Sequence, residues 1–251
     1  MVFIAKTSNP SYWKVVVDTI NTLVEEATFE VNPQGLSFRA MDPSHVALID
    51  LFWPNTAFDS FECDKDVKFS IRVSDFKKLI DRASSKESLE VSMREENFLS
   101  VKIKGEYSSE YSIHLIESTY GPTPLPKISF NAKAVIDSKA SKKILDDISI
   151  ISDHVTLFAT KDKMVFSGKS ETGNVAIELD NNSPALKLLE VKEESKATYN
   201  INYLTSINKA AKEANDFTYE FSNKMPLRLQ FQLTPQGGNV SFYLAPRIEE
   251  R

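Results

Sequence analysis

A short pattern occurs twice in the sequence: Phe3-Ile4-Ala5-Lys6 returns as Phe130-Asn131-Ala132-Lys133. Two further pairs keep the same order, namely Gly35-Leu36-Ser37-Phe38 with Lys163-Met164-Val165-Phe166, and Phe69-Ser70-Ile71 with Tyr199-Asn200-Ile201. A stretch with helical spacing follows the first pair and the third pair in both copies. Internal repetition of this kind indicates a fold built from similar units, so we expect two similar domains.

The segment between the two copies is rich in proline. Residues 118–126 contain three prolines and one glycine in nine residues. Alternate prolines exclude helix and central strand and favour an extended, semi-stiff segment. We therefore expect an N-terminal domain at 1–117, a linker at 118–129 and a C-terminal domain at 130–251.

Four stretches have the apolar spacing of an amphipathic helix, residues 13–27, 74–83, 138–151 and 203–214. Much of the remainder alternates apolar and polar residues, as in Leu99-Ser100-Val101-Lys102-Ile103, which is typical of a strand with one buried face. Turn signals separate these strands. The pattern predicts an α+β fold, in which each domain has antiparallel sheet with two helices on one face.

The composition excludes several classes of site. Seven scattered glycines in 251 residues cannot assemble a phosphate-cradling loop. Cys63 is the single cysteine, which excludes an internal disulfide framework and a cysteine-clustered zinc site. The histidines, His45, His114 and His154, lack zinc-protease spacing. We therefore expect no catalytic residues, no metal and no cofactor.

The ends and the hydropathy of the chain also carry expectations. No apolar run approaches the roughly 18 residues of a membrane-spanning helix. The first residues lack the charged and apolar regions of a signal peptide. We expect an intracellular protein without a membrane segment.

The charge of the predicted helices differs slightly from that of the rest of the chain. The four stretches hold nine basic residues, Lys14, Lys77, Lys78, Arg82, Lys139, Lys142, Lys143, Lys209 and Lys212. They also hold eight acidic residues, Asp18, Glu25, Glu26, Asp75, Asp81, Asp146, Asp147 and Glu213. The whole chain has a net charge of -5, so it cannot coat nucleic acid through bulk positive charge. From these counts alone, solvated helix faces are the simpler interpretation.

Two longer motifs make a family resemblance specific. The segment from Gly35 to Leu48, which contains Arg39-Ala40-Met41-Asp42-Pro43-Ser44-His45, closely resembles the signature of the proliferating cell nuclear antigen family of DNA sliding clamps. The segment from Phe242 to Glu250 resembles the C-terminal motif of that family. The resemblance covers the whole chain, duplication and linker included. The form of the motifs, and the absence of an acidic extension at the end, resemble archaeal members.

The resemblance implies a fold and a function. Members form closed rings of three subunits with helices lining the hole and sheets outside. The ring encircles duplex DNA without sequence preference, slides along it and tethers enzymes of DNA replication and repair. The implied partners are a clamp loader and, through short peptide motifs, DNA polymerase, nuclease and ligase. The implied protein is not an enzyme. Its place is the cytoplasm or nucleoid if archaeal, and the nucleus if eukaryotic.

The resemblance also implies residues that face DNA. Lys14, Lys78, Lys143 and Lys209 match basic residues of the inner surface of the family, and five others are nearby candidates, namely Lys77, Arg82, Lys139, Lys142 and Lys212. Val15, Asp81 and Asp146 stand where some relatives carry a base. We therefore expect comparatively weak contacts with DNA.

Two further surfaces follow from the same resemblance. The positions that match a pocket for partner peptides are Met41, His45, Leu125, Pro126, Pro226, Tyr243, Ala245 and Pro246. Family topology places the edge strands that pair between subunits near 109–117 and 172–179. Their alternating apolar residues are Tyr111, Ile113 and Leu115 in the first strand, and Val175 and Ile177 in the second.

Two alternatives stay open. The first is a hydrolase that uses Asp146 and Asp147, although adjacent helical residues point about 100° apart and are poorly placed to share a substrate. The second is a subunit of a heterotrimeric or checkpoint-type clamp, which shares the fold without assembling with itself.

Overall fold

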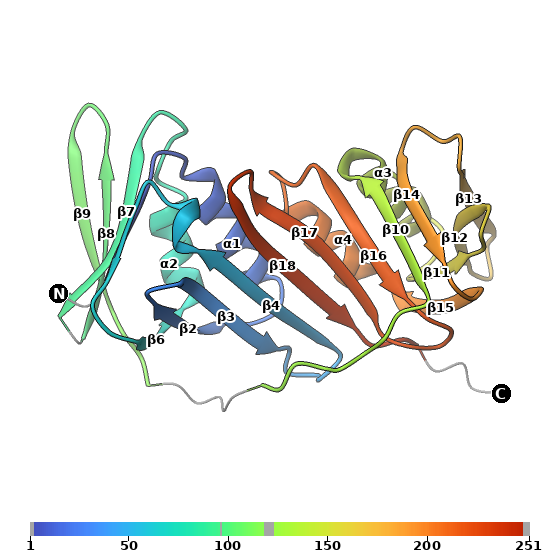
Figure 1. Ribbon diagram of the computed structural model, residues 1–251, viewed down its shortest axis with the longest axis horizontal. Coiled ribbons are helices and arrows are strands. Elements are labelled where there is room, and N and C mark those ends of the chain that lie inside the picture. Colours follow the sequence, from blue (N-terminus) through green and yellow to red (C-terminus); the bar gives the residue numbers. More distant parts are fainter. Residues whose placement is uncertain (1–2, 96, 118–122, 248–251) are drawn as a thin grey trace. The chain divides into compact units, whose positions relative to one another are not determined.

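The computed structural model describes residues 3–95, 97–117 and 123–247. The chain forms two compact units. The first combines the segment up to Pro43 with Ile49–Pro124 and Gln232–Val240, and the second combines Ser44–Leu48 with Leu125–Phe231 and the segment from Ser241 onward. Each unit contains antiparallel strands and two helices (Figure 1).

The first unit holds most of the elements up to β9. In chain order they are β1 (Phe3–Thr7), α1 (Ser11–Asn21), β2 (Glu26–Asn32), β3 (Gly35–Met41), β4 (Ala47–Pro54), the 3₁₀ turn η1 (Asn55–Ala57), β5 (Ser60–Cys63), β6 (Val67–Arg72), α2 (Val73–Ile80), β7 (Ser88–Glu95), β8 (Phe98–Lys104) and β9 (Ser108–His114). Five strands form a sheet in the order β5-β1-β7-β8-β9, and four others are neighbours in the order β4-β3-β2-β6.

The second unit holds most of the elements from β10 onward. They are β10 (Ala132–Asp137), α3 (Ser138–Ser149), β11 (His154–Ala159), β12 (Lys163–Lys169), β13 (Asn174–Asp180), β14 (Leu186–Val191), β15 (Ser195–Asn200), α4 (Ile201–Ala210), β16 (Asp216–Phe221), β17 (Leu227–Thr234) and β18 (Gly237–Leu244). Four strands form a sheet in the order β13-β12-β11-β15, and four others are neighbours in the order β14-β10-β16-β17. This architecture confirms the predicted α+β fold of antiparallel sheets with two helices in each half.

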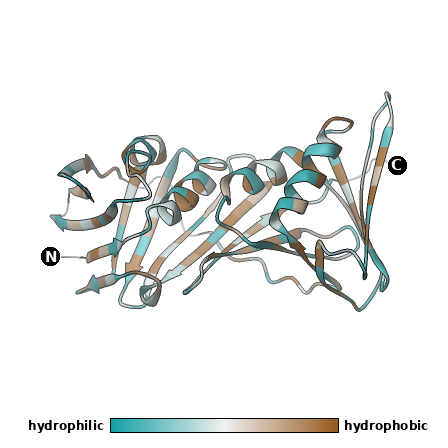
Figure 2. Ribbon diagram, turned by 90° about the horizontal axis from the view of Figure 1, so that it is seen from above, coloured by the Kyte–Doolittle hydropathy of each residue, from teal (hydrophilic) through white to brown (hydrophobic). Residues whose placement is uncertain are grey.

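The helices lie on one side of the strands in each unit and carry both hydrophobic and hydrophilic residues (Figure 2). Most of the apolar residues that the helical period predicted to be buried are so, for example Val16, Val17 and Ile20 on α1, and Ile144 and Leu145 on α3. Val15 is also buried, which the period did not predict, and Leu79 is only half-buried. Burial of one apolar face is what stabilises such short helices, because isolated helices of this length are marginal in water.

The predicted boundaries of the first helix were wrong at its C-terminal end. The helix ends at Asn21, where short bonds from Leu23 N–H to the Ile20 carbonyl (3.0 Å) and from Thr22 Oγ1 to the Thr19 carbonyl (2.7 Å) close the last turn. Glu26 already belongs to β2, so it and Glu25 are not helical. The apolar spacing continued by coincidence into buried residues of a turn and a strand, which periodicity alone cannot distinguish from helix.

The other helices differ from expectation by a few residues. Side-chain caps set the starts of two of them: Asp137 Oδ1 accepts from Lys139 N and Ala140 N at 3.0 Å, and Asn200 Oδ1 accepts from Asn202 N at 2.9 Å. Such capping oxygens satisfy backbone donors that a helix leaves without partners. The last helix ends at Ala210, four residues before the predicted end.

The two units pack their helices by different chemistry. The first unit uses a cluster of aromatic rings, in which Trp13 makes edge contacts with Trp53 (4.9 Å) and Phe76 (5.6 Å between centroids). The second unit places a polar group between its helices. Ser141 Oγ on α3 donates to Asn208 Oδ1 on α4 at 2.8 Å and lies 2.6 Å from the hydroxyl of Tyr219 on β16. Burial raises the pKa of Tyr219 to about 12.

The segment after β18 is held on the second unit by Arg247. Its backbone N–H donates to the Thr198 carbonyl at 2.7 Å, and its Nη1 lies 3.2 Å from His154 Nδ1. Burial lowers the pKa of His154, the charge of Arg247 lowers it further, and Asp153 acts in the opposite direction. The neutral imidazole is therefore the form that this contact favours.

No helix in the described part of the chain is long and apolar enough to cross a membrane.

We predict that Ser141→Ala lowers the free energy of unfolding by about 1–3 kcal/mol, because the buried Asn208 and Tyr219 lose a hydrogen-bond partner. Denaturant titration measures this change. Ser149→Ala is the matched control, since Ser149 is exposed at the end of the same helix, and it should stay within about 0.5 kcal/mol of the unmodified chain. Equal effects of the two changes would contradict a structural role for the buried group.

We predict that His154 makes stability depend on pH. The folded chain binds a proton at His154 less readily than the unfolded chain, because the pKa is lowered in the fold. The stabilising contribution is therefore present above the ordinary histidine pKa of about 6.5 and is lost as the pH falls through it. Unfolding titrations from about pH 7.5 to 5.5 should show a smaller loss for His154→Gln than for the unmodified chain. Equal losses of unfolding free energy in the variant and the unmodified chain would contradict the role of His154.

Candidate functional site

The predicted DNA-facing residues lie on or directly after the four helices. Lys14 is on α1, Lys77 and Lys78 are on α2, and Arg82 follows α2. On the second unit the set is Lys139, Lys142 and Lys143 on α3, Lys209 on α4, and Lys212 just beyond it. Lys14 and Lys77 are half-buried and the other seven are exposed. The helices thus bring each unit's share of the set to the outward side of a helix pair.

The lysines of the first unit are engaged within that unit. Lys77 Nζ contacts the carboxylate of Asp18 on α1 and donates to Asp81 Oδ2 at 2.9 Å. Lys78 Nζ lies 3.1 Å from Asp75 Oδ1, and Lys14 Nζ lies 3.4 Å from the Asp81 carbonyl oxygen. Burial lowers the pKa of Lys77, but hydrogen bonds with Asp18 and Asp81 outweigh burial and raise it. Lys77 therefore joins the two helices as a cation.

The lysines of the second unit are arranged differently. Lys139, Lys142, Lys143 and Lys209 are exposed, and none of them forms an ion pair with the residues that the structure describes. Asp81, one of the predicted departures from the family pattern, accepts a hydrogen bond from Lys77. Asp146, another of them, lies one turn after Lys142 on α3.

The residues predicted to form a peptide pocket come from several segments. In the second unit, Ala245 N donates to the Val46 carbonyl at 2.9 Å, which places Ala245 beside the loop that carries His45. His45 is exposed and has a left-handed backbone with φ of 57°. Pro226 and Pro246 are half-buried. Met41 ends β3 in the first unit, where it is half-buried.

Two of the pocket residues differ sharply in exposure. Leu125 is 40% exposed and Tyr243 is 7% exposed. Arg228 has a raised pKa to which Glu220 and Tyr243 both contribute, its guanidinium lies 5.1 Å from the centroid of the Phe130 ring, and its Nε donates to Glu220 at 2.6 Å. Sequence reasoning assigned no role to Arg228, because a single arginine on an alternating strand carries no motif. The structure places Arg228 between the ring of Phe130 and the carboxylate of Glu220.

The predicted edge strands are sheet edges in the structure. β9 pairs with β8 on one side and ends the five-stranded sheet, and β13 pairs with β12 and ends the four-stranded sheet. Tyr111, Ile113, Val175 and Ile177 are half-buried on these strands. Leu115 lies one residue beyond β9, which ends at His114, and its backbone N–H donates to the Asn97 carbonyl at 3.1 Å.

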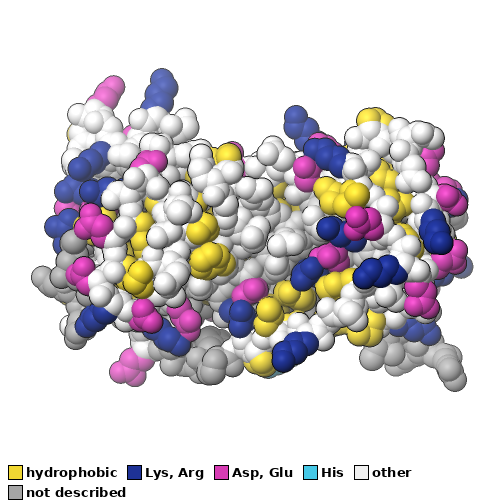
Figure 3. Space-filling model, in the orientation of Figure 1, with side chains coloured by type: hydrophobic (Ala, Val, Ile, Leu, Met, Phe, Trp, Pro, Cys, Tyr) yellow, Lys and Arg dark blue, Asp and Glu magenta, His cyan; other side chains and the backbone are white. Residues whose placement is uncertain are grey.

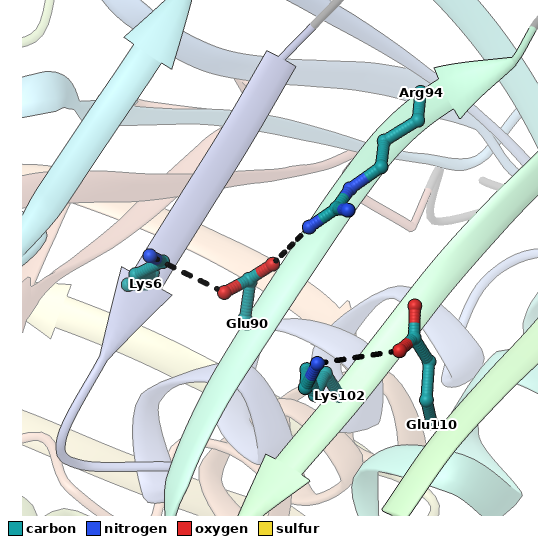
Figure 4. Close-up of polar contacts among 5 residues, drawn as sticks. All are labelled: Lys6, Glu90, Arg94, Lys102 and Glu110. Atoms are coloured by element: carbon teal, nitrogen blue, oxygen red, sulfur yellow. Dashed lines mark hydrogen bonds and ion pairs between the residues drawn. The ribbon is translucent and has the colours of Figure 1, made fainter. Parts of the chain in front are cut away.

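Charged side chains of alternating sign lie on neighbouring strands of the five-stranded sheet in the first unit, in two separate sets of contacts (Figure 4). Glu90 on β7 is buried and contacts Lys6 on β1 at 3.4 Å and Arg94 at 3.3 Å. Lys102 on β8 lies opposite Glu90 and contacts Glu110 on β9 at 3.3 Å. The alternation of sign across neighbouring strands favours this pairing. The edge strand is therefore fastened on its inner side and has its other side open.

Charges of both signs are interspersed on the face shown in Figure 3. No group of three or more His, Cys, Asp or Glu side chains that could hold a metal ion occurs within the described ranges.

Models of protein families match almost the whole chain. Residues 2–117 match the N-terminal domain of proliferating cell nuclear antigen, and residues 124–247 match its C-terminal domain. A protein of Nitrosopumilus maritimus named DNA polymerase sliding clamp is 45% identical, over 99% of this chain and 100% of its own length. A protein of Pyrococcus furiosus with the same name is 33% identical over 94% of each chain.

The fold agrees with a solved structure of the same family. The crystal structure of proliferating cell nuclear antigen from Thermococcus kodakaraensis superposes with a TM-score of 0.94 at 28% identity, covering 98% of this chain and 100% of the other. Sequence, family models and fold lead to one conclusion: the chain belongs to the proliferating cell nuclear antigen family, in the company of archaeal DNA polymerase sliding clamps.

Proposed function

We propose that the protein is a DNA polymerase sliding clamp that encircles duplex DNA as a closed homotrimeric ring and has no enzymatic activity of its own. The observation that carries this proposal is the 45% identity, over the full length of both chains, to a protein named DNA polymerase sliding clamp. Inside the cell it would serve DNA replication and repair by tethering polymerase, nuclease and ligase. A clamp loader would place it on DNA.

The two open sheet edges support assembly into a ring. An unpaired edge strand offers a row of backbone donors and acceptors to another chain and is a liability in a monomer. β9 and β13 are edge strands of two different sheets. The β9 edge of one copy can therefore pair with the β13 edge of the next copy. Such head-to-tail contacts close into a ring when the rotation permits. The proposed interface residues are Tyr111, Ile113, Leu115, Val175 and Ile177.

The proposed division of the chain follows the same scheme. The family models meet between residues 117 and 124, within the proposed linker at 118–129, so the proposed domains are 1–117 and 130–251. The described end of the linker, from residue 123, contains no helix or strand and exposes Leu125. An exposed leucine between Pro124 and Pro126 suits an apolar anchor of a short partner peptide.

We predict that the loaded protein leaves DNA only through an end or an opened interface. Phosphate attraction falls steeply with salt because counterions are released on binding, whereas topological retention does not. After loading, the protein should survive a wash at about 1 M salt on circular duplex and escape from the same duplex once it is linearised. Gel filtration of complexes with labelled protein measures the retained fraction.

Ile113→Lys supplies the control for ring closure. Ile113 is half-buried in the single chain, so a lysine can reach solvent in a monomer but places a charge in the proposed apolar seam. The unmodified chain should have a mass of about 85 kDa, three times 28.3 kDa, and the variant should lose both this mass and retention on circles. Equal release of the unmodified protein from circular and linear DNA would overturn encirclement. Trimer formation only with a different subunit would indicate the heterotrimeric alternative.

We predict that Leu125→Ala weakens the binding of a clamp-binding peptide by about 1–3 kcal/mol, as for an apolar anchor site. Titration calorimetry with the trimer measures the affinity. Leu188→Ala is the matched control, because Leu188 is similarly exposed (36%) on β14 and lies outside the proposed pocket set. Trimer mass should stay unchanged in both variants. Unchanged affinity of the Leu125 variant would remove this residue from the pocket.

A further inference from the structure

β15 is the last strand of the four-stranded sheet, and its open edge holds two separate segments of the second unit. Lys224 N donates to the Lys196 carbonyl at 3.0 Å, and Arg247 N donates to the Thr198 carbonyl at 2.7 Å. The first bond belongs to the loop between β16 and β17, and the second to the segment after β18. Both segments carry residues of the proposed peptide pocket. Because the two carbonyls are two residues apart on one strand, the two attachment points lie about 7 Å apart along it.

The loop between β16 and β17 has a backbone conformation that depends on its contacts. Lys224 has a left-handed backbone with φ of 55°, which is unfavourable for a residue with a Cβ atom. Such a conformation persists only where the surrounding structure fixes it. Within the loop, Met225 N donates to the Ser222 carbonyl at 3.2 Å. Pro226 follows directly, so its place depends on how this turn is held.

Tyr199 on β15 holds the loop from inside the unit. Its side chain is fully buried (0% exposed), and its hydroxyl donates to the Met225 carbonyl at 2.7 Å. Burial raises the pKa of Tyr199, so the hydroxyl keeps its proton and remains a donor. The Met225 carbonyl belongs to the planar peptide unit that contains the ring nitrogen of Pro226. The hydrogen bond therefore orients the peptide plane from which the proline ring projects.

The same loop is also connected to the end of the proposed linker. Ser222 is buried, and its Oγ accepts from Asn131 N at 2.9 Å and donates to the Ser129 carbonyl at 3.4 Å. The loop is thus bonded to the linker end on one side and to β15 on the other. Movement of the loop would change the place of both.

We propose that the edge of β15 supports the peptide pocket and that Tyr199 is its positioning residue, because the Tyr199 hydroxyl fixes the peptide unit of Pro226. The inference rests on the proposed function, since it needs the pocket to bind partner peptides. Tyr199 is buried and acts through Pro226 instead of touching the peptide. A wall that is already ordered loses less conformational freedom on binding, so this support raises the affinity for the peptide.

The test removes the hydroxyl and keeps the aromatic ring. Tyr199→Phe deletes the bond to the Met225 carbonyl. Tyr219→Phe is the matched control, because it deletes an equally buried hydroxyl of the same unit that lies beside Ser141 on α3. Titration calorimetry uses the trimer and the same clamp-binding peptide as for Leu125→Ala. The Kd of Tyr199→Phe should rise about three- to tenfold, as for the loss of one hydrogen bond, and that of Tyr219→Phe should stay within about twofold.

A double-mutant cycle separates positioning from general destabilisation. If Tyr199 acts through the proline, Tyr199→Phe should weaken peptide binding less in a Pro226→Ala background than in the unmodified protein, because coupled changes are not additive. Tyr219→Phe should be additive with Pro226→Ala. Hydrogen exchange gives a second readout, since the Lys224 N–H should exchange faster in Tyr199→Phe than in Tyr219→Phe.

An unchanged Kd in Tyr199→Phe, or an equal rise of the Kd in both tyrosine variants, would overturn the inference. If Tyr199→Phe does not form a trimer, Arg247→Pro tests the same edge, because it removes the backbone donor to the Thr198 carbonyl at an exposed residue. The Kd of this variant should also rise, and an unchanged Kd would speak against β15 as the support.

The failure of the proposed function would look different. If the unmodified protein were released equally from circular and linear duplexes, encirclement would fail whatever the peptide affinities. If the unmodified trimer were retained on circles but did not bind the peptide, the pocket and this inference would fall together while the ring would stand. If it bound the peptide and Tyr199→Phe bound equally well, only the inference would fall.

Discussion

Burial of one apolar face of each helix against the strands is the constraint on which the rest of the structure depends. Helices of 8 to 12 residues are marginal alone and persist because residues such as Val17, Ile20, Leu145 and Ile148 are removed from water. Once those faces are turned inward, the charged residues between them can only face outward. The outward charge of each helix pair is thus a consequence of core packing, and the two pairs then differ in how they neutralise it.

The same constraint leaves the sheet edges as the other surface that can act between chains. Helices cover a sheet face, but they cannot satisfy the backbone groups along its rim. In the first unit, the backbone pairing of β9 with β8 and the Lys102–Glu110 ion pair hold the edge strand on its inner side (Figure 4). An edge strand that is already ordered loses less conformational entropy when a partner strand pairs with it than a frayed strand would.

The duplication has allowed the two halves to diverge in their interiors while they keep one fold. Aromatic packing of Trp13 with Trp53 occupies the first unit, and the buried group of Ser141, Asn208 and Tyr219 lies in the second. Aromatic rings can pack against each other in several orientations, whereas a hydrogen bond requires a narrow range of distance and angle between its two partners. The buried hydrogen bonds of the second unit therefore restrict how α3 and α4 lie against each other, and they do so without an ion pair of a lysine.

The sequence by itself determined the duplication, the number and type of helices, the alternating strands and the family, because periodicity and long motifs are local properties of the chain. It misplaced the end of the first helix, where the apolar residues Val24 and Ala27 kept helical spacing outside a helix. It also placed the end of the edge strand near 117, whereas β9 ends at His114. Only the tertiary structure decided which lysines of the helices form ion pairs with other described residues, as Lys77 does with Asp18 and Asp81. Lys77 and Asp18 are 59 positions apart in the sequence, and Ser141 and Asn208 are 67 positions apart. Such pairs come into contact only when the helices pack. Charge counts cannot reveal this, because the attraction between a charged side chain and a new partner depends on the ion pairs that the side chain already forms.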